Sequence, residues 1–402
     1  MPRCRRLEAV GMMSLLIPLA AFVLLVGNAA AWMSVYNRVH ATGLPRALVQ
    51  LLGLAALAAL LLLSVLPVAW MITGRLPRLI ADHRAAISLA VLWASVSLGM
   101  FVFVTASWFF RRRDVDPPHR LAANNTRLLD VTRLLGHVPS DDWLTRALAR
   151  LPGNEVLQVH VQHKVLRATG LPRDLDGLRI AHLSDLHMTG RFTAAFLDLI
   201  VDEVNQWGVD LVAVTGDIVD AEACIDWVPR TLGRLSAPAG CFFVLGNHDR
   251  LLKDVRRLRA VLENAGFTDL GGRCITRSIR NSHVLLAGNE RPWFPALPPV
   301  AQPADRSEQF AVALSHSPDQ LPWARALRFD LMLAGHVHGG QIRLPVIGPV
   351  VCPSHFGVRF ASGLFDAPPT LMHVTRGLSG CFPLRWNCPP EICLLELRTG
   401  ER

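Results

Sequence analysis

Residues 178–187 read LRIAHLSDLH, an apolar run that ends in an acidic residue followed two positions later by a histidine. Four more runs of this kind lie in the second half of the chain, at residues 211–217, 242–247, 310–316 and 331–336. Each ends in a side chain that can bind a metal ion. The seven candidate ligands are Asp185, His187, Asp217, Asn247, His316, His336 and His338. Short apolar runs with polar boundaries are typical of buried β-strands, so we predict five strands whose ends carry a site.

The segments between these runs have helical periodicity. Apolar residues in Thr193–Trp207 recur on one helical face, and Leu251–Ala265 shows the same pattern. Strands alternating with helices indicate an α/β layered domain, in which ligands bind at the carboxyl ends of the strands. All five polar endings fall at such ends. The alternating run Val156–Val165 predicts a half-buried strand where the globular domain begins.

The seven side chains combine hard oxygen donors with imidazole nitrogens and include no thiolate. This mixture suits Mn, Fe or Zn better than Ca or Mg, and it does not match a structural zinc site. Taken singly, each motif also fits a strand end followed by a turn, or a core histidine. Taken together, they favour a shared metal centre, because unpaired imidazole and amide groups behind apolar strands would be costly to bury.

The order of the motifs resembles the calcineurin-like metallophosphoesterase family. The family's DxH motif matches at Asp185, its GDxxD motif at Gly216, its GNH[DE] motif at Gly246 and its GHxH motif at Gly335, with His316 as the single histidine between the last two. The block GHVHGGQIRLP at 335–345 and the ending NCPPEI at 387–392 are similar to a membrane-associated bacterial branch. The resemblance covers about residues 177–397 and implies a four-layer αββα sandwich holding two divalent metal ions.

The resemblance also divides the ligands between the two ions. One ion would be held by Asp185, His187, Asp217 and His338, and the other by Asp217, Asn247, His316 and His336. Asp217 would then bridge them, since a carboxylate has two oxygens and can span ions roughly 3.5 to 4 Å apart. The glycines before Asp217, Asn247 and His336 would let the chain turn sharply off each strand.

Beside the ligands, the resemblance implies catalytic roles for two neighbours. His248 would protonate the leaving oxygen or stabilise the transition state, and Asp249 would orient His248 or support its positive charge. The alternative is that His248 only packs against the ligands. Arg343 is a candidate phosphate contact, with an ordinary surface or core-edge arginine as the alternative. The implied reaction is hydrolysis of a phosphodiester or pyrophosphate bond by metal-activated hydroxide.

Three stretches in the first third of the chain lack Asp, Glu, Lys and Arg, at residues 9–37, 47–74 and 85–110. Each exceeds the roughly 20 residues that a helix needs to cross a bilayer. We predict an all-α transmembrane region of about three helices over 1–113, a connector over 114–155 and the metallophosphoesterase domain over 156–402. The spacing of leucines in 121–135 predicts a helix in the connector, either amphipathic on the bilayer or packed on the domain. The alternative to the anchor is a signal peptide followed by buried helices.

The charge distribution argues against a nucleic-acid substrate. The 402-residue chain carries a net charge of +9, but residues 1–120 hold twelve arginines against four acidic residues. The rest has 29 basic and 28 acidic side chains. The excess therefore belongs to the membrane flanks, where runs such as Arg111–Arg113 anchor helices at the interface. Both membrane orientations place six arginines in the cytoplasm. The arginine count therefore does not decide on which side of the membrane the catalytic domain lies.

The eight cysteines do not form a recognisable framework. Cys381, Cys388 and Cys393 lie close together in sequence without a CxxC pair, and we interpret them as buried free thiols. A membrane anchor concentrates an enzyme where lipids are. We therefore expect a multi-pass protein of the inner cell membrane that acts on a phosphorylated lipid or cell-envelope precursor. Two alternatives are a phosphodiesterase of soluble nucleotides and a metal-binding membrane sensor or scaffold without turnover.

Overall fold

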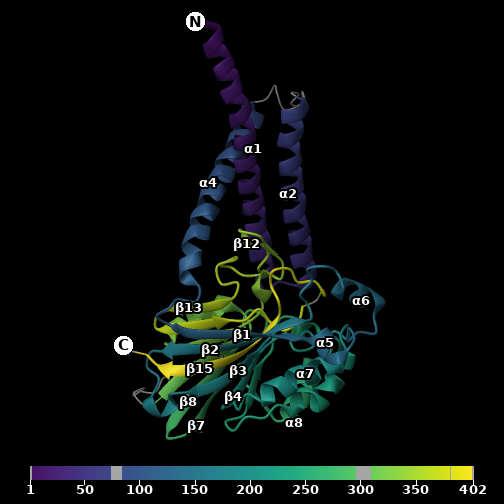
Figure 1. Cartoon of the computed structure of the whole chain (residues 1–402), viewed down its shortest axis with the longest axis vertical. Coiled ribbons are helices and arrows are strands. Elements are labelled where there is room, and N and C mark those ends of the chain that lie inside the picture. Colours follow the sequence, from purple (N-terminus) through teal and green to yellow (C-terminus); the bar gives the residue numbers. More distant parts are fainter. Residues whose placement is uncertain (1, 74–83, 296–308, 381, 401–402) are drawn as a thin grey trace. The chain divides into compact units, whose positions relative to one another are not determined.

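The computed structural model describes residues 2–73, 84–295, 309–380 and 382–400. The chain divides into two compact units, residues 1–112 and 113–402 (Figure 1). The first unit is helical and the second contains the predicted strands.

The described part of the first unit consists of α1 (Pro2–His40), α2 (Arg46–Thr73) and α4 (Arg84–Asp114, whose last two residues belong to the second unit). Segments Leu16–His40, Arg46–Val65 and Ile87–Arg111 are long and apolar enough to cross a membrane. Asn28 links the three helices, because its side chain donates to Ser64 Oγ at 3.0 Å and accepts from Trp93 Nε1 at 3.1 Å. Such polar links between helices are common in membrane bundles.

The second unit contains two mixed β-sheets. The larger has the strand order β1-β2-β15-β3-β4-β5-β6, and the smaller has the order β13-β14-β10-β9-β8-β7. The strands of the larger sheet are β1 (Leu121–Asp130), β2 (Gln158–Ala168), β15 (Glu391–Thr399), β3 (Leu178–Leu183), β4 (Leu211–Thr215), β5 (Cys241–Val244) and β6 (Phe267–Asp269). The smaller contains β13 (Gly363–Ala367), β14 (Thr370–Val374), β10 (Leu331–Ala334), β9 (Gln309–Ser315), β8 (Ser282–Asn289) and β7 (Cys274–Ile279).

All five predicted ligand strands are confirmed as β3, β4, β5, β9 and β10. The first three are parallel neighbours in the larger sheet, and the other two are parallel neighbours in the smaller sheet. The predicted strand at 156–165 is confirmed as β2, whose side chains alternate in burial over much of its length.

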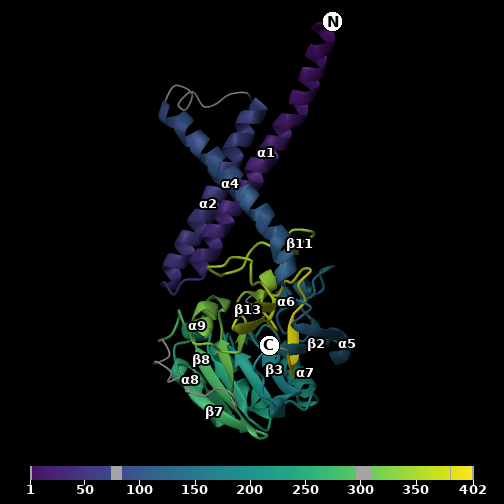
Figure 2. The same ribbon diagram turned by 90° about the vertical axis from the view of Figure 1, so that its left-hand side faces the viewer.

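Three hydrophobic cores separate four layers. Along β4, Leu211 and Ala213 face a core shared with the smaller sheet, whereas Val212 and Val214 face a core shared with α7 (Ala194–Asn205) and α8 (Val255–Asn264). This alternation follows from the two-residue period of a strand that is buried on both faces. The third core joins the smaller sheet to α9 (Leu321–Ala326) and neighbouring loops (Figure 2). The predicted α/β sandwich preceded by helices is confirmed.

The helix predicted over 121–135 is wrong for most of its length. Residues 121–130 form β1, which pairs antiparallel with β2 at the edge of the larger sheet. Only α5 (Val131–Leu135) is helical there, and α6 (Trp143–Ala149) follows. The leucine spacing is compatible with a helix, but hydrogen bonding to β2 overrides this weak local preference. The segment 114–155 is thus part of the compact second unit.

The interpretation of the cysteines near the end of the chain as buried free thiols is confirmed for the two that the structure describes. Cys388 and Cys393 are buried and free, and burial raises the pKa of the Cys393 thiol well above its ordinary value. Cys381 lies outside the described residues.

Candidate metal centre

The ends of five strands bring the seven predicted ligands to one place between the two sheets. Asp185, His187, Asp217 and Asn247 follow β3, β4 and β5 of the larger sheet, while His316, His336 and His338 follow β9 and β10 of the smaller sheet. Amides of one turn bind side chains of another. For example, the amide of His336 donates to both carboxylate oxygens of Asp185 at 3.1 Å, across the two sheets.

Five of the seven predicted ligands have left-handed backbone conformations. The φ angles are +53° at Asp185, +43° at His187, +51° at Asp217, +70° at His336 and +48° at His338. Such angles are uncommon outside glycine and cost free energy, and they cluster at functional sites. The sharp turns aim successive side chains back over the strand ends.

Glycines before the ligands allow close packing. A Cβ at Gly246 would lie 2.6 Å from the amide nitrogen of Asp217 and 2.7 Å from Cδ2 of His316. Residue 216 must be glycine for two reasons. Its φ is +84°, and an added Cβ would lie 2.6 Å from Nδ1 of His316. Both positions therefore require glycine because ligand side chains occupy the space.

Six of the seven predicted ligands form two groups whose donor atoms are close enough to share an ion. Asp185, His187 and His338 make one group, and Asp217, His316 and His336 make the other. In the first, Nε2 of His338 lies 3.2 Å from Nε2 of His187 and 3.5 Å from Oδ1 of Asp185. In the second, Nε2 of His316 lies 3.1 Å from Oδ2 of Asp217. His187, Asp217 and His248 make a third group that overlaps both others.

Unpaired buried atoms indicate that these groups fit metal ions. Oδ1 of Asn247 and Nε2 of His336 are buried and have no hydrogen-bond partner among the described residues. Nδ1 of His316 contacts the carbonyl of Thr215 at 2.7 Å, so its Nε2 is the nitrogen directed toward Asp217. Buried polar atoms without partners are rare and costly. A bound cation would give each of them a partner.

The protonation states also suit metal binding. Burial raises the pKa of Asp217, but His316 and His248 outweigh it and hold the pKa well below its usual range. Burial lowers the pKa values of His336 and His338 well below the ordinary value. At neutral pH the Asp217 carboxylate is thus ionised and the His336 and His338 imidazoles are neutral, the forms that bind metals. Burial lowers the pKa of His316, but Asp217 outweighs it and raises the pKa to about 9, so this imidazole must release a proton when it binds a metal.

Asp220 belongs to the site, although it is not among the predicted ligands and catalytic groups. Its Oδ1 lies 3.0 Å from Nδ1 of His187, and its Oδ2 lies 3.2 Å from Nδ1 of His248. Burial raises the pKa of Asp220, but hydrogen bonds from these two histidines outweigh it and lower the pKa to about 2. A carboxylate behind a metal-binding histidine fixes its tautomer and orientation. The GDxxD spacing was the signal that could have identified it.

Asp249, predicted to orient His248 or support its positive charge, binds backbone amides. Its Oδ1 accepts the amides of Ile218 and Val219 at 2.9 Å, and its Oδ2 accepts the amide of Gly246 at 2.8 Å. The carboxylate is fully buried and joins the loops that carry Asp217 and Asn247. Oδ2 of Asp220 contacts the ring of His248, and the catalytic role of Asp249 remains a prediction.

Comparison with known proteins agrees with this geometry. The sequence profile of the calcineurin-like phosphoesterases matches residues 178–340. The phosphodiesterase YaeI of Escherichia coli is 31% identical over 226 residues, which cover 54% of this chain and 82% of YaeI. The chain belongs to the calcineurin-like metallophosphoesterase family. It is accordingly a metal-dependent phosphoester hydrolase.

Two further proteins are similar. YkuE of Bacillus subtilis is 28% identical over 253 residues, covering 60% of this chain and 86% of YkuE. The UDP-2,3-diacylglucosamine pyrophosphatase LpxG of Chlamydia trachomatis is 27% identical over 301 residues, covering 59% of this chain and 91% of LpxG.

Residues after β8 shape one wall of the metallophosphoesterase site. Trp293 is buried, and its ring centroid lies 4.7 Å from that of His336 and 5.5 Å from that of His316. Glu290 accepts the amide of Leu245 at 2.6 Å and pairs with Arg259 at 2.6 Å. Glu290 therefore fixes the end of β5 just before Asn247, and Trp293 packs against two of the ligands.

Arg343 is held by protein groups. Its Nε donates to the carbonyl of Gly339 at 2.7 Å, and its Nη2 donates to Oγ of Ser362 at 2.6 Å. These bonds fix the turn that follows His338. Its role as a phosphate contact remains a prediction.

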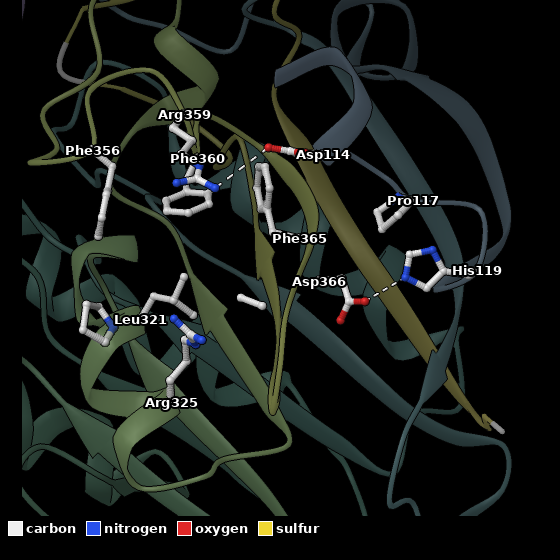
Figure 3. Close-up of a pocket in the computed structure, with 12 residues that line it drawn as sticks. Asp114, Pro117, His119, Leu321, Arg325, Phe356, Arg359, Phe360, Phe365 and Asp366 are labelled. Carbon is white, nitrogen blue, oxygen red and sulfur yellow. Dashed lines mark hydrogen bonds and ion pairs between the residues drawn. The ribbon is translucent and has the colours of Figure 1, made fainter. Parts of the chain in front are cut away.

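A cavity of about 390 Å³ lies in a different part of the metallophosphoesterase unit (Figure 3). It is lined by none of the seven ligands. Side chains from α9, from β13 and from the start of the unit surround it, among them Asp114, Arg325, Arg359 and Phe360.

Proposed function

We propose that this protein is a membrane-anchored phosphoesterase with two divalent ions, which hydrolyses a phosphodiester or pyrophosphate bond of a phosphorylated lipid or cell-envelope precursor. The observation that carries the proposal is the pair of donor groups adjoining at Asp217, with His248 beside them. Asp185, His187, Asp217 and His338 would hold one ion, and Asp217, Asn247, His316 and His336 the other. Manganese, iron and zinc all suit this donor set.

Two divalent ions held by these residues would supply an activated water as nucleophile and offset negative charge on the phosphate oxygens. The protein's own part is to fix the donors before substrate arrives. Three features limit movement of the predicted ligands. These are the left-handed turns, the hydrogen bonds from backbone amides to the Asp249 carboxylate, and the packing of Trp293. Preorganisation of this kind lowers the cost of reaching the transition state.

His248 would donate a proton to the leaving oxygen. Its Nδ1 faces Asp220, so the proton would come from Nε2. The Asp220 carboxylate would hold the ring in one orientation and stabilise its positive charge before the transfer. A carboxylate that orients an imidazole in this way has the same role as the acid in hydrolase triads.

The substrate class rests on the helices and on one relative. Three helices suited to a bilayer precede the catalytic unit, and LpxG is named for a diacylated nucleotide sugar. We therefore infer a multi-pass protein of the inner cell membrane that acts on a lipid-linked phosphate. A soluble nucleotide substrate would require no anchor. The near-neutral charge of the chain beyond residue 120 gives no support to a nucleic-acid substrate.

Turnover of bis-p-nitrophenyl phosphate by the purified full-length protein tests the chemistry. We expect Asp217→Ala and His248→Ala each to lose activity, while Asp226→Ala, at a largely exposed residue, keeps it. Unchanged turnover in both site variants would refute the assignment. For the substrate class, lipid extracts from cells that carry the wild type or Asp217→Ala should differ in a phosphorylated lipid that accumulates only with the variant.

A further inference from the structure

An exposed apolar hairpin follows the last metal ligands. It consists of β11 (Arg343–Leu344) and β12 (Gly348–Pro349) joined by a three-residue tip. Residues 344–351 read LPVIGPVV and include no charged or hydrogen-bonding side chain. Leu344 is 45% exposed, Val346 75% and Ile347 53%. A cluster of large apolar side chains on the surface of a globular unit marks an interaction site.

The tip of this hairpin is strained. Val346 has a φ of +66°, and a β-branched residue in the left-handed region is a genuine outlier. This backbone conformation costs free energy. It leaves the apolar side chain of Val346 exposed to solvent. Strain of this kind persists where the surrounding structure imposes it, which is common at functional segments.

A second apolar loop lies beside the hairpin. Phe382 is 48% exposed and Trp386 is 53% exposed. The amide of Arg343 donates to the carbonyl of Trp386 at 2.9 Å, and Nε2 of Gln341 donates to the carbonyl of Phe382 at 2.9 Å. The two loops therefore form one surface. We name it the apolar rim, made of Ile342, Leu344, Val346, Ile347, Phe382 and Trp386.

The apolar rim adjoins the metal centre. Gln341 follows His338 by three residues, and its amide donates to the carbonyl of His338 at 3.0 Å. Arg343 binds the carbonyl of Gly339. A molecule that covers the rim would thus be placed next to the catalytic groups.

The chain path indicates what covers this surface. The third candidate span ends at Arg111, and Asp114 follows three residues later, a reach of at most about 10 Å. Val115 pairs with Phe365 of β13, and Arg343 of the hairpin donates to Ser362 just before β13. The part of the second unit that contacts the base of the hairpin is therefore tethered close to a bilayer surface.

The cavity near Asp114 combines basic and aromatic side chains with the two carboxylates of Asp114 and Asp366. Arg325 and Arg359 line it together with Phe356 and Phe360, and Nη2 of Arg359 lies 3.9 Å from Oδ2 of Asp114 (Figure 3). Cationic groups and aromatic rings side by side match the boundary between anionic headgroups and acyl chains. Tryptophan prefers the same depth, which agrees with the exposure of Trp386.

We propose that the apolar rim inserts into the bilayer interface and that amphiphilic substrates reach the metal centre from the membrane. The rim would replace water contacts by acyl-chain contacts, as interfacial amphipathic segments do. The docking itself does not depend on catalysis. The entry route rests on the proposed function, and it gives the substrate class as phosphate esters that carry a hydrocarbon chain.

A depth measurement tests the docking. The full-length protein with Ile347→Cys, labelled with an environment-sensitive fluorophore, is reconstituted in vesicles of phosphatidylglycerol and phosphatidylethanolamine. The matched control is Ala260→Cys, an exposed site on α8, which lies at the opposite end of the second unit from the hairpin (Figure 1, Figure 2). Signal from native cysteines is subtracted with labelled wild type. We expect lipid-borne nitroxides to quench the probe at 347 and aqueous iodide to quench the probe at 260.

Two outcomes would overturn the docking. Quenching of the 347 probe by iodide alone would place the rim in water. Protection from both quenchers would mean that protein covers it, from this chain or a second copy. Neither outcome depends on turnover.

Two substrates test the entry route. The probes are p-nitrophenyl hexadecyl phosphate in vesicles and soluble bis-p-nitrophenyl phosphate. Ile347→Asp should lower the ratio of kcat/KM for the hexadecyl ester to that for the soluble ester several-fold, because a charge opposes insertion. An unchanged ratio would contradict the route. Failure of the wild type to hydrolyse either ester would instead contradict the proposed function.

Discussion

The carboxylate of Asp220 contacts Nδ1 of His248 at 3.2 Å. The same carboxylate contacts Nδ1 of His187 at 3.0 Å, so one side chain orients both a candidate ligand and the proposed acid. Asp220→Asn keeps the shape but removes the charge. We expect kcat/KM to fall by about 10- to 100-fold, as for other groups behind metal ligands.

Steady-state kinetics on bis-p-nitrophenyl phosphate measures this effect. Asp226→Asn, which alters a largely exposed carboxylate paired with Arg257, is the matched control and should leave kcat/KM unchanged. Equal activity of Asp220→Asn and wild type would show that His248 does not depend on this contact.

Gly246→Ala should lower metal content as well as activity. The added methyl group would press on the Asp217 amide and the His316 ring, and overpacking of this kind costs about 1–3 kcal/mol. Gly99→Ala is the control, because a Cβ there meets no described atom within 4 Å. Metal analysis of both purified variants checks the prediction, and full metal content in Gly246→Ala would contradict it.

His182 should make stability depend on pH. It is buried between Thr215 and His373, with contacts of 2.9 Å to each, and burial lowers its pKa to about 3. An unfolded chain takes up this proton near pH 6.5. Below pH 6.5 the unfolded state therefore binds a proton that the folded state does not. His182 alone should therefore lower the free energy of unfolding by up to about 1.4 kcal/mol for each pH unit below 6.5.

Thermal unfolding of the detergent-solubilised protein between pH 8 and pH 5 measures this slope. His182→Gln should flatten the decline, whatever its effect on absolute stability. His137→Gln, at an exposed histidine, is the matched control substitution. The same decline in His182→Gln and wild type would rule out this contribution.

Glu290→Gln should destabilise the domain. The buried carboxylate accepts hydrogen bonds from the Leu245 amide and from Arg259. Replacing it by a neutral amide removes the charge that pairs with the Arg259 guanidinium and weakens both hydrogen bonds. We expect a loss of about 1–3 kcal/mol in the free energy of unfolding. Glu263→Gln alters a more exposed pair with Arg273 and should change it by less than about 1 kcal/mol. Similar losses in the two variants would count against a special role for Glu290.

Most of the fold that positions the site can be predicted from sequence. The ligand strands are apolar runs with sharp polar ends, so β3, β4, β5, β9 and β10 are recognisable without knowledge of their partners. The edge strand β1 is not, because its side chains are largely exposed and only pairing with β2 defines it. Its leucines therefore give a misleading helical spacing.

Side-chain partners are harder to predict than strand ends. Asp249 is adjacent to His248 in sequence, yet its carboxylate binds the amide of Gly246 in its own turn and the amide of Ile218 in the turn after β4. Asp220 contacts His248 although the two residues lie 28 positions apart along the chain. The GDxxD spacing marks Asp220 as a site residue, but its partner depends on the left-handed turns at the predicted ligands, which the spacing does not specify.

Metal titration of the apo-protein tests the shared centre most directly. Full-length protein stripped with a chelator is titrated with Mn²⁺ or Zn²⁺ while bis-p-nitrophenyl phosphate hydrolysis and bound metal are measured together. We expect activity to rise until two ions are bound per chain, and Asp217→Asn to bind fewer and remain inactive. Full activity with one ion or none, or unchanged binding in Asp217→Asn, would contradict a two-ion centre bridged by Asp217.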